Sequence, residues 1–305
     1  MRKLEGDDHI HGFEKKDLPK NIFGILSRFL LKGNRLKKIE WLLRIIPGQK
    51  NLAELISHFL HVINGDVRAT VDKCLQYCKS VTILTMDFEF MGAGVPERLF
   101  EDQLIEALEM KKIYGKEKVK VFMCLDPRRP NLLQLVHRYY NYIDGYKLYS
   151  PLGYKANDTV IRMILYVLPK PVISHCTNTS PVFGKQLKNP EYYKNLAHPC
   201  YLYELAEEFP KINFSADHWG GEDENWKKFI DDRLGGNFFT NVAFTYMKPV
   251  LSELEKHENV KFGSDYCMGE IEEPVENIYE AYMKLPLHIK EKLNKSYLKF
   301  YENQC

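Results

Sequence analysis

Short apolar runs alternate with longer amphipathic segments through most of the chain. Residues 81–87 form an apolar run of strand length, and residues 99–114 place apolar side chains at helical spacing. This pairing predicts a buried strand followed by a helix. Strands are predicted in this way at 81–87, 119–126, 145–149, 171–175, 212–217, 238–242 and 260–265, and helices at 99–114, 132–142, 159–168, 201–209, 225–234, 248–257, 275–283 and 289–300.

The N-terminal segment Asp7-Asp8-His9-Ile10-His11 adds one more predicted strand. Side chains alternate along a strand, so His9 and His11 are expected on the same face, where two imidazoles can bind a metal. With this segment, eight strands alternate with helices over residues 1–305. The pattern predicts an α/β protein, a (β/α)8 TIM barrel in a single domain.

A long connection separates the first two strands. Residues 12–50 contain two amphipathic segments, and helices are predicted at 51–64 and 66–78. We therefore expect a long helical insertion after strand 1, which either packs outside the barrel or covers a site at the end of that strand. An exposed helical face within residues 22–46 would allow a homodimer. His58 and His61 of this insertion are expected to be surface or packing residues.

Composition narrows the classes of partner. The 305 residues include 45% hydrophobic residues, enough for a large core, and carry a net charge of +2, which does not favour nucleic acid or an anionic membrane. The seven scattered cysteines suggest a reduced, cytoplasmic protein. The sequence has neither an eighteen-residue apolar run nor a signal-peptide core. A small molecule is the expected partner.

Reactive side chains recur at the predicted carboxyl ends of the strands, where barrels of this kind carry their chemistry. They are His9, His11, Asp87, Glu89, Asp126, Arg128, Arg129, Lys147, Tyr149, His175, Asp217, His218 and Asp265. Closure of the barrel would bring the last strand beside the first, and therefore Asp265 beside His9 and His11. Three imidazoles, with His175 as the third, and a carboxylate suit one divalent ion, most readily zinc, with manganese as the alternative.

Such an ion would lower the pKa of a bound water. Asp265 could then take the water's proton, and His218 could act as a general acid or base. Each residue also has another interpretation. His175 could be a histidine of the core, Asp265 a turn or helix-cap residue, and His218 a loop residue. Their joint placement at matching strand ends favours the metal site.

Four motifs together resemble the amidohydrolase superfamily, in particular the branch that includes aminocarboxymuconate-semialdehyde decarboxylase. They are Asp7-x-His9-x-His11, Ser174-His175, His218-Trp219-Gly220-Gly221 and Gly263-Ser264-Asp265. The resemblance implies His9, His11, His175 and Asp265 as metal ligands and His218 as a catalytic residue. It also implies that Lys147 either bridges two metals as a carbamate or contacts substrate. Trp219 replaces a small residue common in the family, which would reshape the substrate pocket.

Three functions remain open from the sequence. The first is hydrolysis of a small carboxylate-bearing ester, lactone or amide by a metal-activated water. The second is a non-oxidative, metal-dependent decarboxylation on the same scaffold. In both, Arg128, Arg129 or Lys147 could bind a substrate carboxylate. The third is a catalytically silent barrel used for binding, which would be expected to lack a ligand residue, although every ligand position is filled.

Overall fold

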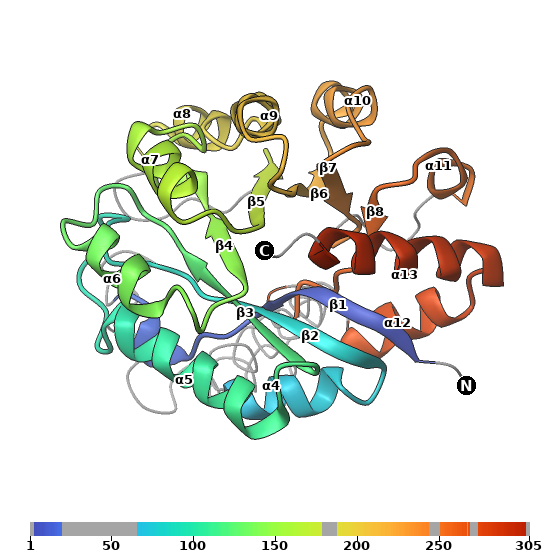
Figure 1. Ribbon diagram of the computed structural model, residues 1–305, viewed down its shortest axis with the longest axis horizontal. Helices are drawn as coiled ribbons and strands as arrows, with labels where there is room; N and C mark the ends of the chain where they lie inside the picture. The colour runs from blue at the N-terminus through green and yellow to red at the C-terminus, as the bar shows by residue number, and fades with distance from the viewer. Residues whose placement is uncertain are drawn as a thin grey trace, which may run out of the picture.

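A computed structural model describes residues 3–19, 66–178, 188–243, 251–266, 268 and 274–302. Eight parallel strands lie side by side in chain order, with the helices around them (Figure 1). The strands are β1 (Leu4–His11), β2 (Cys78–Leu84), β3 (Val119–Cys124), β4 (Gly145–Leu148), β5 (Val172–Thr177), β6 (Phe214–Gly220), β7 (Phe238–Asn241) and β8 (Val260–Lys261). Their residues are mostly buried, as expected for parallel strands covered on both faces.

The residues that follow β8 close the barrel against β1. Asp8 donates its backbone N–H to the carbonyl of Phe262 at 3.1 Å, and the N–H of Asp265 donates to the carbonyl of His9 at 2.9 Å. A parallel bridge also joins Ile10 to Tyr266. The predicted (β/α)8 barrel is thus confirmed. The regular part of the last strand is shorter than the predicted 260–265, because beyond Lys261 the backbone turns to follow β1.

The helices follow the predicted rhythm, with small differences at their ends. They are α4 (Val67–Cys74), α5 (Phe100–Tyr114), α6 (Leu132–Tyr139), α7 (Thr159–Val167), α8 (Pro190–Asn195), α9 (Pro199–Glu208), α10 (Glu224–Asp231), α11 (Leu251–Lys256), α12 (Val275–Met283) and α13 (Leu287–Glu302). Short 3-10 turns at Lys15–Asp17 and Ser150–Leu152, and α8, were not predicted. The helix predicted at 66–78 ends at Cys74, because Cys78 already begins β2.

Aromatic and aliphatic side chains fill the barrel below the strand ends. One buried cluster contains Leu84, Phe122, Ile173, Phe239 and Phe300, which come from four different strands and from α13. Because these strands lie around the ring, the cluster occupies its interior. Asn213 donates to the carbonyl of Phe300 at 3.0 Å and so fixes the C-terminal turn of α13.

Part of the predicted insertion lies outside the described residues. This applies to the predicted lid from residue 20 onward, to the helix at 51–64 and to His58 and His61. None of the described helices is both long and apolar enough to cross a membrane.

Candidate metal centre and active site

An extra residue in β1 turns both Asp8 and His9 toward buried partners. Asp7 pairs with Val81 of β2 and Ile10 pairs with Ile83, so three steps along β1 match two along β2. Such a bulge breaks the alternation of side chains. Asp7 then contacts Tyr279 of α12, whereas Asp8 and His9 contact other strands of the barrel. His9 and His11 still lie on the same side, as predicted.

His9, His11 and Asp265 form the candidate metal site. Nε2 of His9 lies 3.2 Å from Oδ1 of Asp265, and Nε2 of His11 lies 2.9 Å from the same oxygen. One ligand atom from each residue lies within 4.8 Å of the others, and all three side chains are buried. Nδ1 of His11 has no hydrogen-bond partner among the described residues. Two imidazoles and a carboxylate that converge in this way are a suitable donor set for a divalent transition metal.

Asp217 of β6 fixes the orientation of His9. Nδ1 of His9 lies 2.6 Å from Oδ2 of Asp217, and the other oxygen of this carboxylate accepts a hydrogen bond from the Ser215 hydroxyl at 2.5 Å. A histidine that donates its Nδ1 proton to a carboxylate presents the lone pair of Nε2 to a metal. Nε2 is the nitrogen of His9 that faces Asp265.

His218 and His175 lie beside this group. The ring of His218 is centred 4.8 Å from that of His9 and 4.4 Å from that of His175. Nδ1 of His218 lies 3.0 Å from the carbonyl of Ala243, which can only accept a hydrogen bond, so Nδ1 carries the proton and donates. Nε2 is then the basic nitrogen. Tyr149 packs on the other side of His175, with ring centres 4.5 Å apart.

Burial keeps these imidazoles neutral. It holds the pKa of His9 and that of His175 well below the ordinary value, and the nearby Lys147 and His218 act in the same direction. Burial likewise lowers the pKa of His218. Metal binding requires neutral imidazole, so the environment favours the ligating form before any ion arrives.

Lys147 of β4 points into the same site. Its side chain is fully buried, and its Nζ lies 3.4 Å from Nε2 of His9. Burial lowers its pKa, against the opposing effect of Asp217 and Asp265. Lys147 is therefore within reach of the candidate metal position.

Arg128 and Trp219 already have partners elsewhere. Arg128 forms a two-point ion pair with Asp126, with Nε 2.8 Å from Oδ1, and donates to the carbonyl of Leu152 at 2.9 Å. About a third of the Arg128 side chain remains exposed at the end of β3, with a relative accessibility of 33%. The Trp219 indole N–H donates to Asp231 of α10 at 2.6 Å. This contact places the indole on the α10 side of β6.

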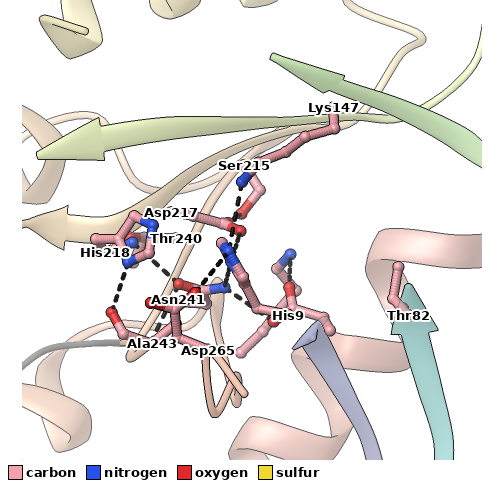
Figure 2. Close-up of polar contacts among 12 residues, drawn as sticks. His9, Thr82, Lys147, Ser215, Asp217, His218, Thr240, Asn241, Ala243 and Asp265 are labelled. Atoms are coloured by element: carbon pink, nitrogen blue, oxygen red, sulfur yellow. Dashed lines mark hydrogen bonds and ion pairs between the residues drawn. The ribbon is translucent and has the colours of Figure 1, made fainter. Parts of the chain in front are cut away.

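Asn241 of β7, which was not predicted as a site residue, lies between His9 and His218 (Figure 2). The signal was a polar residue at the carboxyl end of the apolar run Phe238-Phe239-Thr240. Strand seven was the strand whose end carried neither a histidine nor a charged residue.

Of the comparisons with known proteins, the one with solved structures bears on the fold. No protein-family model matches the sequence, and no curated protein matches it significantly. Among solved structures, 5-carboxyvanillate decarboxylase from Novosphingobium aromaticivorans, complexed with manganese and 4-hydroxy-3-methoxy-5-nitrobenzoic acid, has a TM-score of 0.61 at 11% identity, over 98% of this chain and 96% of that one. This likeness supports the (β/α)8 barrel fold.

Two further structures resemble the chain more weakly. A TatD family hydrolase from Entamoeba histolytica has a TM-score of 0.49 at 11% identity and covers 99% of this chain and 100% of that one. An adenine deaminase from Arthrobacter aurescens has a TM-score of 0.48 at 13% identity and covers 98% and 94%, respectively.

Proposed function

We propose that the protein is a metal-dependent enzyme that binds one divalent ion through His9, His11, His175 and Asp265. The observation that carries the proposal is the convergence of ligand atoms from the first and last strands, within 4.8 Å of one another for His9, His11 and Asp265. Zinc or manganese would suit these donors. When bound, the ion would act as a Lewis acid that polarises a substrate oxygen and acidifies water.

Our first candidate reaction is hydrolysis of an ester, lactone or amide of a small carboxylic acid. Asp265 would accept a proton from the attacking water, because its carboxylate lies at the centre of the site. His218 would take up that proton at Nε2 and deliver it to the leaving group. Its Nδ1 contact with Ala243 would hold the ring in place during both transfers.

A second candidate is non-oxidative decarboxylation. The likeness in fold to 5-carboxyvanillate decarboxylase favours it. Here His218 would deliver the proton that replaces the departing carboxyl group. The exposed part of Arg128 could bind a substrate carboxylate while Asp126 holds its guanidinium. Trp219 is the weaker candidate for substrate binding, since its indole nitrogen is engaged by Asp231.

Lys147 has two proposed roles in either reaction. Its lowered pKa favours the neutral amine, which can form a carbamate with carbon dioxide and bridge two ions. As the ammonium, it would instead bind a substrate carboxylate beside His9. Metal stoichiometry separates the two roles, because a bridging carbamate requires two ions for each chain.

Metal content and product analysis test the proposal together. The purified chain should hold one equivalent of zinc or manganese, and Asp265→Asn and His9→Ala should each lose the ion and more than 100-fold in turnover, at the upper end of what the loss of such a group costs. Exposed His137 is the control, and His137→Ala should retain both. Release of carbon dioxide from carboxylated phenols supports the decarboxylase, and ring opening of lactones supports the hydrolase. A wild-type chain without stoichiometric metal would overturn the proposal.

A further inference from the structure

Asn241, the last residue of β7, connects His9 and His218, two of the histidines of the candidate active site. Its amide oxygen accepts hydrogen bonds from the backbone N–H of His218 at 3.0 Å and of Ala243 at 3.3 Å. Its amide nitrogen donates to Oδ1 of Asp8 at 2.9 Å and lies 3.3 Å from Nδ1 of His9. Figure 2 shows the amide between the end of β1 and the turn that carries His218.

The chemistry of these neighbours requires an amide. Two backbone N–H donors face one side of Asn241 and a carboxylate faces the other, so only a group with both an acceptor and a donor satisfies all of them. Asn241 is fully buried. A hydrocarbon side chain would leave buried donors without partners, which is unfavourable.

Asp8, which accepts the hydrogen bond from the Asn241 amide nitrogen, is itself held in place. Asp8 forms a fully buried ion pair with Lys261 of β8, and Nζ of Lys261 lies 3.7 Å from the centre of the Phe300 ring. Because Nδ1 of His9 donates its proton to Asp217, its approach to Asn241 is a packing contact and not a hydrogen bond. Because Asp8 holds the Asn241 amide in place, the amide limits rotation of the His9 ring.

The amide oxygen of Asn241 accepts a hydrogen bond from a strained segment of backbone. His218 has a φ of 71°, in the left-handed region that side chains with a Cβ rarely adopt. Its backbone N–H is held by Asn241 and its ring by the Ala243 carbonyl. The same asparagine thus supports the backbone on which the His218 ring is oriented.

We propose that Asn241 is a positioning residue that holds His9 and His218 in one fixed relation. Metal binding at His9 and proton transfer at His218 would then depend on the same amide, although Asn241 itself touches neither ion nor substrate. The inference rests on the proposed function, because it takes His9 as a metal ligand.

The test is the dissociation constant of the full-length chain for zinc and manganese, measured by competition with a chromogenic chelator. We expect Asn241→Ala to weaken binding by about 10–100-fold, as for other groups that orient a ligating histidine. Thr240→Ala is the matched control. Thr240 is fully buried on the same strand and donates to the carbonyl of Ala216 at 2.6 Å, so its loss should lower the melting temperature and leave the dissociation constant unchanged.

Each outcome bears on one proposal only. Wild-type affinity in Asn241→Ala, or an equal loss in Asn241→Ala and Thr240→Ala, would overturn the positioning role. Failure of the wild-type chain to bind either metal would overturn the proposed function instead. If Asn241→Ala does not fold, Asn241→Ser provides the test, because a hydroxyl is too short to bridge Asp8 and the His218 backbone. The serine variant should show the same loss, and wild-type affinity in it would contradict the proposal.

Discussion

Left-handed backbone is concentrated at residues of the candidate active site. In the described part of the chain, the non-glycine residues with positive φ are His218, Trp219 and Asp265, at 71°, 46° and 58°. Such conformations are unfavourable and persist where surrounding contacts hold them. The backbone N–H of Asp265 donates to the His9 carbonyl, and that of His218 donates to Asn241. The sequence therefore predicted these two residues but not the backbone that directs them.

A half-buried lysine away from the site offers a test of the electrostatics. Nζ of Lys120 on β3 lies 4.9 Å from the centre of the Tyr301 ring, and burial lowers the pKa of Lys120 despite the nearby Asp144. The unfolded chain thus binds this proton more tightly than the folded chain. The contribution of Lys120 to the free energy of unfolding should rise with pH until the ordinary value of 10.5.

We predict that Lys120→Met raises the melting temperature at pH 7, because it removes the cost of burying the charge. The difference from wild type should narrow as pH approaches 10.5, the ordinary value for lysine. Calorimetry at a series of pH values measures this, and Lys118→Met, at an exposed position, is the control and should change little. A difference in melting temperature that widens with pH would contradict the cost assigned to burying the Lys120 charge.

At the scale of elements, the seam between β8 and β1 depends on Gly263. A Cβ built at this position would lie 2.8 Å from the Cβ of His9, 2.9 Å from the Asn241 amide nitrogen and 2.9 Å from the Asp8 carboxylate. Contacts this short force a shift of one strand against the other. The glycine of the Gly-Ser-Asp motif thus permits the close approach that brings Asp265 to His9 and His11.

We predict that Gly263→Ala destabilises the fold by about 1–3 kcal/mol, the usual range for overpacking, and also weakens metal binding. Denaturant unfolding and chelator competition measure the two effects. Gly115→Ala is the control: Gly115 follows α5 with a φ of 92°, and a Cβ there would meet no described atom within 4 Å. The control should lose stability through backbone strain and keep wild-type metal affinity. Normal metal affinity in Gly263→Ala would show that the seam tolerates the shift.

In the molecule as a whole, the candidate metal site connects the first strand of the barrel to the segment that follows the last strand. His9 and His11 belong to β1, whereas Asp265 follows β8, and hydrogen bonds between these segments close the ring. An ion bound by all three residues would stabilise that closure in the folded state alone. Metal binding and global stability should therefore be coupled.

We predict that free metal at 100 times its dissociation constant stabilises the chain by about 2.7 kcal/mol over the chelated form. This corresponds to a melting temperature higher by roughly 5 °C for a chain of this size. Thermal unfolding with and without chelator measures the difference. Asp265→Asn should show no response to metal, and an equal response in the variant would place the stabilising ion elsewhere.

The alternation of strands and helices, and most of the reactive residues, could be predicted from the sequence. Strand-length apolar runs and helical periodicity are local properties, so they predicted strands β2 to β8 and the helices between them, except α8, without knowledge of the tertiary structure. Reactive side chains at the strand ends, together with the motifs, indicated His9, His11, Lys147, Asp217, His218 and Asp265. All of these lie at or directly beside the candidate centre.

The orientation of these residues, and the contacts that support them, could not be predicted without the tertiary structure. The bulge in β1, the left-handed turn at His218 and the role of Asn241 depend on hydrogen bonds between strands that are far apart in the chain. The same holds for the pairing of Arg128 with Asp126 and for the direction of the Trp219 indole toward α10. Local sequence patterns do not encode such contacts, because each needs a partner that only barrel closure supplies.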